Sequence, residues 1–207
     1  MKETYVKKGK STFLSILILS FSLVLLCIIE YTADCREVRD GVLRLHILAD
    51  SDSEEDQSVK LLVRDALLSS GAAIFDGSVC ADDAVEKISP EISFLEETAN
   101  SVLRENGFDY NAKVSITREY FATRQYDSKT LPAGEYTALK VILGEGDGHN
   151  WWCVMFPPLC LPAASDTEEE YCVFDEDGRR VVSGSGHYAV RFKIAEWWEE
   201  IKERLFN

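Results

Sequence analysis

The segment from Phe13 to Ile29 constrains this chain most, because it is an apolar run of 17 residues without a charge. Four lysines, at positions 2, 7, 8 and 10, precede the run, and Glu30 follows it. A basic stretch before an apolar run is typical of a membrane-targeting segment whose N-terminus stays in the cytoplasm. The run is long for the core of a signal peptide and slightly short for a spanning helix. We therefore expect the residues after about position 30 to be exported.

The sequence leaves two fates of this segment open, an uncleaved anchor and a cleaved signal. We favour the anchor, because the best match to a small-x-small cleavage site, Tyr31-Thr32-Ala33, places Tyr at the −3 position. The Leu25-Leu26-Cys27 stretch also lacks the small residue that a lipoprotein site needs before its cysteine. A buried core helix is a third interpretation, which the lysine cluster disfavours. The expected organisation is an anchor or signal segment over 1–30, a linker over 31–40 and an extracytoplasmic domain over 41–207.

The charge of the exported part excludes one class of function. The chain has a formal net charge of −14, and residues 1–29 contribute +3, so the remainder carries −17. Nucleic-acid binding depends on Lys and Arg side chains that neutralise phosphates. We therefore expect no nucleic-acid partner. Hydrophobic residues make up 46% of the chain, which is enough to bury a core.

Hydrophobic periodicity predicts a single α+β domain, in which a mostly antiparallel sheet has helices packed on one face. Strands are expected over 41–49, 112–121, 136–143 and 152–156, with a loop over 124–134. A hairpin over 171–182 and an amphipathic helix over 190–205 complete the predicted elements.

Two helical patterns lie between the first two expected strands. The first should be capped by Ser53 and should end near Gly71. Its expected buried face consists of Val59, Leu62, Val63, Ala66 and Leu67. The second runs from Val85 to Val102, and Pro90 inside it could either start a fresh helix or kink a single long one.

The segment from Gly144 to Cys160 concentrates costly residue types: three alternating glycines, two tryptophans, a Pro-Pro pair and two cysteines. The glycines predict a turn rather than a phosphate-binding loop, because no lysine or helix follows and Glu145 and Asp147 would repel an anion. If Trp151 and Trp152 lie on a strand, they point to opposite sides of the sheet. One can then pack inside while the other faces outward as a contact residue.

The sequence contains no recognisable catalytic signature. Asp50-Ser51-Asp52 is interpreted as a turn and helix cap rather than as a metal or phosphate site. A zinc site from His46, His149, His187, Cys153 and Cys160 is disfavoured, because Cys-x6-Cys is not a usual ligand spacing. No nucleophile elbow and no His-Glu-x-x-His motif occur. We therefore predict no catalytic residue, no cofactor and no metal, which favours a binding or signalling module over an enzyme.

Three blocks of the sequence resemble the stage II sporulation protein R family. The first is Arg44-Leu-His-Ile-Leu-Ala-Asp-Ser-Asp-Ser53, followed by Glu55-Asp-Gln57 and Val63-Arg-Asp-Ala66. The second is Leu131-Pro-Ala-Gly-Glu-Tyr136. The third holds Gly-Glu-Gly, His-Asn-Trp-Trp-Cys and Phe-Pro-Pro-Leu-Cys between Gly144 and Cys160. Asp50 stands where Asn is expected in the family, and the acidic segment from Pro162 to Tyr171 departs from it.

The resemblance implies an exported developmental signal of endospore-forming bacteria. Such a protein is made in the forespore, is anchored in the forespore membrane or secreted, and acts between the forespore and mother-cell membranes. It would activate a membrane-bound mother-cell protease of aspartyl type, which then removes the pro-sequence of a sigma factor. The protein would act as an allosteric ligand of that receptor protease, and its N-terminal segment would bind the membrane.

We expect the receptor-binding surface in the third block. The expected contact residues are Gly146, His149, Asn150, Trp151, Trp152, Phe156, Pro157 and Pro158. The alternative function is an exported cell-wall hydrolase that uses His46, His149 and nearby acidic residues.

We predict that Cys153 and Cys160 are bonded to each other in the exported protein; two free thiols and a metal site are the alternatives. The reasons are the oxidising compartment, the short separation and the Pro-Pro turn between them. Closing a loop of this size stabilises the fold by about 2.5 kcal/mol through the unfolded chain. Peptide mapping after alkylation without reduction tests the pairing, and alkylation of both cysteines would contradict it.

Overall fold

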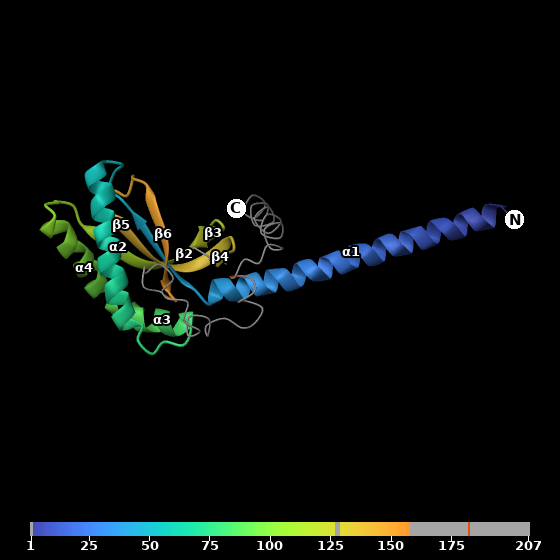
Figure 1. Cartoon of the computed structure of the whole chain (residues 1–207), viewed down its shortest axis with the longest axis horizontal. Helices are drawn as coiled ribbons and strands as arrows, with labels where there is room; N and C mark the ends of the chain where they lie inside the picture. The colour runs from blue at the N-terminus through green and yellow to red at the C-terminus, as the bar shows by residue number, and fades with distance from the viewer. Residues whose placement is uncertain (1, 127–128, 158–181, 183–207) are drawn as a thin grey trace.

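The structure is a computed structural model, and it describes residues 2–126, 129–157 and 182 (Figure 1). The helices are α1 (Lys2–Asp40), α2 (Glu54–Ile74), α3 (Ala81–Ile88) and α4 (Ile92–Glu105), with a 3₁₀ turn at Ser89–Glu91. The strands are β1 (Leu43–Leu48), β2 (Ala112–Phe121), β3 (Arg124–Tyr126), β4 (Lys129–Leu131), β5 (Gly134–Leu143) and β6 (Asn150–Phe156).

Four strands form one sheet in the order β2-β5-β1-β6. The β2–β5 and β1–β6 pairs are antiparallel, whereas β1 and β5 are parallel. Helices α2, α3 and α4 lie on one face of this sheet (Figure 1). The predicted α+β class, with helices on one face of a mostly antiparallel sheet, is therefore confirmed. The parallel pair arises because the chain passes through the helical layer between β1 and β5.

The main core lies between the sheet and the helices. Alternate residues of each strand point toward the helices, as the period of two requires. Strands β1 and β5 contribute Leu43, Leu45, Ile47, Leu139, Val141 and Leu143, and the helices contribute Val63, Leu67, Leu95, Ala99 and Leu103. Full burial of one such side chain is worth about 1.5–3 kcal/mol, so this layer supplies most of the stabilisation of the domain.

Helix α4 also protects the edge strand β2. The backbone N–H of Ala112 donates to the side chain of Asn100 (2.8 Å), and that of Val114 donates to the carboxylate of Glu96 (3.0 Å). Outward-facing N–H groups of an edge strand otherwise invite pairing with another chain. Two polar side chains of α4 therefore cover the first part of this edge.

The start of α2 was predicted correctly and its end was not. The Ser53 side chain caps the helix by accepting a hydrogen bond from the backbone N–H of Asp56 (3.1 Å). The helix passes Gly71 and ends at Ile74, because Gly71 is buried where the side chain of Met155 packs against it. Leu62, predicted as buried, is 46% exposed, and Leu68 is buried instead. The apolar face of α2 is wide, and the sequence alone does not show which side of that face the neighbouring elements cover.

Pro90 separates two helices rather than kinking one. Helix α3 ends at Ile88, the 3₁₀ turn carries Pro90, and α4 begins at Ile92. Part of the expected loop over 124–134 is a small hairpin of β3 and β4. Apart from Val182, the expected hairpin over 171–182 and the helix over 190–205 lie outside the described residues.

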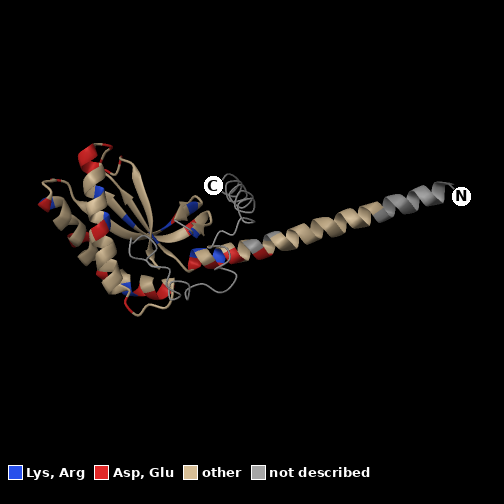
Figure 2. Ribbon diagram, viewed as in Figure 1, with Lys and Arg blue, Asp and Glu red and all other residues tan. Residues whose placement is uncertain are grey.

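Helix α1 is 39 residues long, and its part from Phe13 onward is long and apolar enough to cross a membrane. The described large apolar side chains between Phe13 and Leu26, and that of Ile29, are exposed, and Figure 2 shows no charge along this stretch. Residues 31–40, predicted as a linker, are the last part of the same helix. Within them, Cys35 and Val38 are buried in a second cluster on the sheet face opposite α2 and α4, together with Phe121, Leu131 and Tyr136.

We predict that Ser53→Ala destabilises the protein by about 1 kcal/mol, because the first turn of α2 loses its cap. The measurement is urea unfolding of the purified chain in detergent. Ser58→Ala is the matched control, since Ser58 is exposed inside the same helix and Ala is the better helix former. Equal stability of the Ser53→Ala and Ser58→Ala proteins would contradict this role of Ser53.

Candidate functional site

Two loops meet at the end of the sheet where β1 finishes and β6 begins. The backbone N–H of Asp147 donates to the carbonyl of Asp50 (3.1 Å), and that of Gly148 donates to the carbonyl of Ala49 (2.9 Å). The Asp50 carboxylate accepts from the N–H of Glu145 (2.7 Å), and the Asp52 carboxylate accepts from the N–H of His149 (2.6 Å). The glycine segment is thus a turn, as predicted, and the two aspartates hold it in place. We call residues 50–53 and 144–149 the loop end.

Two glycines allow this close contact. Gly144 has a φ of +57°, and a Cβ atom there would overlap the Asp50 carboxylate. A Cβ atom at Gly148 would overlap the backbone carbonyl of Ser51. A side chain at either position would therefore push the two loops apart. The close contact of the loop end therefore requires glycine at positions 144 and 148 in one loop, packed against Asp50 and Ser51 in the other.

The His149 side chain is exposed at the surface of the loop end. Its Nδ1 atom lies 2.5 Å from the Asp52 carboxylate, and the two side chains are 80% and 56% exposed. The hydrogen bonds from His149 hold the pKa of Asp52 below its ordinary value. The backbone carbonyl of His149 accepts a hydrogen bond from Lys60 of α2 (2.8 Å). The backbone around His149 is therefore anchored while its imidazole faces solvent.

A second polar group lies on the sheet face opposite α2 and α4. His46 of β1 is 5% exposed, and its Nδ1 atom lies 2.5 Å from the carboxylate of Glu119 on β2. Its Nε2 atom lies 3.0 Å from the side-chain oxygen of Asn150. Both ring nitrogens therefore have an oxygen partner, which fixes the orientation of the ring. Trp152 stacks on this ring, with 3.7 Å between the ring centroids.

Glu119 links this histidine to a lysine. Lys140 of β5 donates to the other Glu119 oxygen at 2.5 Å. Burial alone would raise the pKa of Glu119, but the hydrogen bonds from Lys140 and His46 outweigh it and hold that pKa below its ordinary value. The carboxylate is therefore charged and paired on both sides. We call His46, Glu119, Lys140, Asn150 and Trp152 the His46 cluster.

Arg44 lies two residues before His46 on the same face of β1 and is fully buried. Its guanidinium donates to the carbonyl of Cys153 (3.0 Å) and to the hydroxyl of Tyr126 (2.6 Å). It also lies 4.3 Å from the ring centre of Phe121 and 5.0 Å from that of Tyr136. Burial lowers the pKa of Arg44. Aromatic faces and oxygen acceptors thus stabilise the buried cation.

The family model of stage II sporulation protein R matches residues 39–166, which is more than half of the chain. The chain belongs to this family. A curated relative named stage II sporulation protein R, from Bacillus subtilis (strain 168), is 36% identical over 131 residues. The matched region covers 63% of this chain and 58% of the relative, so the chain spans less than two thirds of that protein. No solved structure matches the chain.

The three blocks that resemble the sporulation protein R family come together in the fold. Arg44 of the first block lies against Tyr136 of the second, and the Tyr136 hydroxyl donates to the carbonyl of Pro132 (2.5 Å). His46 of the first block contacts Asn150 and Trp152 of the third. The motifs therefore describe one continuous structure around β1.

The structure separates the expected contact residues into exposed and buried ones. Gly146 and His149 lie in the loop end, and Asn150 is exposed at the start of β6. Phe156 and Pro157 are buried, so we leave them out of the contact surface. Pro158 lies outside the described residues.

The two tryptophans point to opposite sides of the sheet, as predicted. Trp151 packs against the main core beneath Arg64, and Trp152 packs in the second cluster. Both are half-buried, so neither is a freely presented anchor.

Cys153 is buried and disulfide-bonded. Cys160 lies outside the described residues, so the pairing of these two cysteines stays a prediction. His187, one of the residues considered for a zinc site, also lies outside them. Among residues 2–126, 129–157 and 182, no group of three or more His, Cys, Asp and Glu side chains could hold a metal ion.

Glu119 and Lys140 were missed from the sequence. Both lie on predicted strands, at positions that alternate with residues facing the main core, so their shared face could have been predicted. Their contact depends on the β2–β5 register, in which Glu119 faces Tyr136 and Thr117 faces Ala138. That register is not readable from a single sequence, because a loop and a hairpin separate the two strands.

The charged pair at Glu119 predicts a pH dependence. A carboxyl group whose pKa is lowered by folding stabilises the protein above its unfolded pKa, ordinarily 4.5, and this contribution is lost as the pH falls below it. Glu119→Gln should therefore lower the free energy of unfolding at pH 7 by about 1–3 kcal/mol. Between pH 7 and about pH 3, the free energy of unfolding should then fall by less in this variant than in the unsubstituted protein. Urea unfolding at several pH values measures both effects. Glu135→Gln, at an exposed position of β5, is the control. If the free energy of unfolding varied with pH in parallel for the Glu119→Gln and unsubstituted proteins, the pairing of Glu119 with Lys140 and His46 would be contradicted.

Proposed function

We propose that this protein is an exported signal of sporulation that activates a membrane-bound aspartyl protease of the mother cell. The activated protease would remove the pro-sequence of a sigma factor. Membership of the stage II sporulation protein R family supports the sporulation role. An N-terminal helix that is long and apolar enough to cross a membrane supports export or anchoring at the forespore.

The observation that carries the proposal is the construction of the loop end. Its backbone is held by Asp50, Asp52 and Lys60, yet the His149 side chain is 80% exposed. A solvent-exposed side chain on a fixed backbone loses little conformational entropy when a partner binds it. The loop end is therefore suited to recognition by a receptor. Trp151 and Trp152 support it from below rather than contacting the receptor themselves.

As a ligand, the protein would act by population shift. A signal that binds the active state of the protease more tightly than the inactive state raises the active fraction by that ratio of affinities. This needs a preorganised surface and no chemistry on the part of the signal. The His46 cluster agrees with such a role, because it stiffens the sheet beneath Asn150.

The cell-wall hydrolase alternative would need His46 and His149 as catalytic groups. His46 is 5% exposed and both of its ring nitrogens are engaged, which leaves no nitrogen for a substrate. His149 is bonded to Asp52 and belongs to the loop end, not to the His46 cluster. These observations favour the signalling proposal.

We predict that His149→Ala folds normally but fails to trigger processing. The side chain is exposed, so its thermal unfolding should match that of the unsubstituted protein. Loss of a central interface residue costs about 2 kcal/mol, which is about 30-fold in affinity. The measurement is sigma-factor processing by immunoblot in a sporulating host that lacks its own copy of the gene. Lys113→Ala, at an exposed position of β2, is the control and should retain processing.

Normal processing by a normally expressed His149→Ala protein would place the contact surface elsewhere. Peptidoglycan hydrolysis by the purified protein, lost on the same substitution, would instead support the hydrolase alternative.

A further inference from the structure

Helix α1 passes without interruption from the apolar segment into the domain. Ile29 is 62% exposed, whereas Cys35 and Val38 are 1% and 0% exposed. Cys35 lies six positions after Ile29, which is about 9 Å along a helix. Residues 30–40 contain neither glycine nor proline, the residues at which helices most often bend. The membrane segment and the domain thus share one rigid element.

The end of α1 is fastened to the domain by packing and by a hydrogen bond. Cys35 and Val38 pack in the second cluster, whose other members include Phe121 of β2, Leu131 of β4 and Tyr136 of β5. The guanidinium of Arg39 donates to the carbonyl of Ala133 (3.2 Å), and its side chain runs over Gly134, where a Cβ atom would collide with it. Three strands therefore hold the last two turns of α1, which excludes a swivel at this junction.

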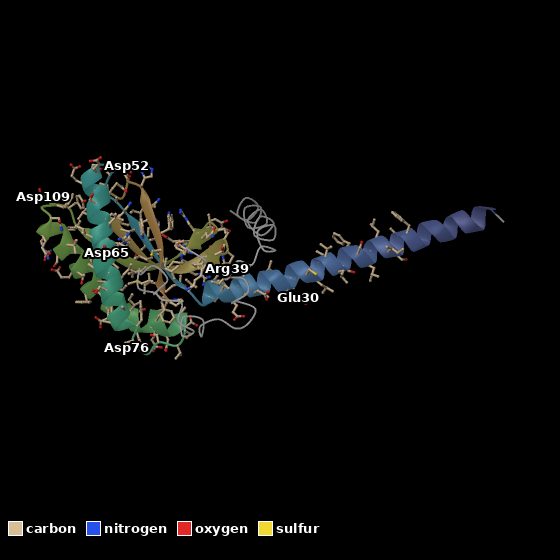
Figure 3. The ribbon with its side chains drawn as sticks, viewed as in Figure 1. Glu30, Arg39, Asp52, Asp65, Asp76 and Asp109 are labelled. Atoms are coloured by element: carbon tan, nitrogen blue, oxygen red, sulfur yellow. The ribbon has the colours of Figure 1, made fainter. Side chains whose placement is uncertain are left out.

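The direction of α1 sets the orientation of the domain. In Figure 1, α1 leaves the domain on the side opposite the layer of α2 and α4. Figure 3 shows Arg39 in the last turn of α1 and Asp109 at the far side of the domain. A membrane crossed by the apolar part of α1 therefore lies on the side of the domain away from α2 and α4.

Both ends of the described domain carry acidic side chains. The helical layer and its loops have exposed carboxylates, which include Glu54, Glu55, Asp65, Glu97, Glu105 and Asp109 (Figure 2). The last part of α1 is also net acidic, because residues 30–40 hold four acidic and two basic side chains. The orientation of the domain therefore rests on the direction of α1.

We propose that α1 is a rigid stalk that stays part of the protein and displays the domain at a fixed height and tilt above the bilayer. The layer of α2 and α4 faces away from the lipid, and the hairpin of β3 and β4 lies on the side nearer to it. The stalk requires only that α1 enters a membrane, so it can be tested separately from receptor activation.

The test uses the full chain in vesicles of phosphatidylethanolamine and phosphatidylglycerol, with an energy-transfer acceptor on outer-leaflet headgroups. A fluorescent amino acid is placed at position 109 or at position 36, both exposed in the structure. We expect the transfer efficiency from position 109 to be about half of that from position 36 or less, because the rest of α1 and the whole domain intervene.

Two insertions after Ala33 distinguish a rigid stalk from a flexible tether, and both leave the buried residues from Cys35 onward in place. Four alanines keep the helix and should preserve the difference between positions 109 and 36. Gly-Gly-Ser-Gly weakens the helix, because glycine is a poor helix former, and should raise transfer from position 109 as the domain begins to tumble. Intact mass spectrometry of chain recovered from cell membranes should show residues 1–33 still attached.

Equal transfer from both positions in the unmodified chain would overturn the proposal, as would a mature chain that begins after Ala33. Identical behaviour of the two insertions would also overturn it. The receptor proposal is independent of these results. A chain that fails the transfer test but triggers sigma-factor processing refutes the stalk alone. A chain that passes the transfer test but does not trigger processing refutes the receptor role alone.

Discussion

The burial of two basic side chains on one strand is the constraint on which the rest of the domain depends. Strand β1 lies between β5 and β6, so both of its edges are paired, and the main core and the second cluster cover its two faces. Its residues Leu43, Leu45 and Ile47 meet the helices, which leaves Arg44 and His46 to be buried on the other face. A buried cation is costly unless acceptors and aromatic rings surround it. The neighbouring strands therefore have to supply these groups at fixed positions.

That requirement explains the layout of the second sheet face. Glu119 and Asn150 serve His46, while Tyr126 and the Cys153 carbonyl serve Arg44. These partners come from β2, β3 and β6, all of which are far from β1 in sequence. The polar contacts thus fix the positions of these strands relative to β1, whereas the apolar contacts on the helix side supply most of the stabilisation.

Sequence periodicity predicted the elements well where one face was clearly apolar. β2 was predicted with its observed ends, and the cap at Ser53 was found because its pattern is local. The end of α2 was missed because Gly71 has a packing role that only the position of Met155 reveals. The role of residues 31–40 was missed because their apolar residues are few and their partners lie about 90 residues further along the chain. The loop-end glycines were interpreted correctly as a turn, but the partner loop that requires them was not foreseeable.

The contact between Asp50 and Gly144 has a consequence for how these sequences can vary. The atom that accepts the hydrogen bond from Glu145 is Oδ1, which aspartate and asparagine share, so the exchange of Asn for Asp at position 50 keeps the contact. A longer or branched residue at position 50 would lose it, and any side chain at position 144 would displace it. The two positions, 94 residues apart, are therefore coupled, because the residues allowed at one depend on the residue at the other. In a homologue in which one of the two has been replaced, the other is expected to vary more freely.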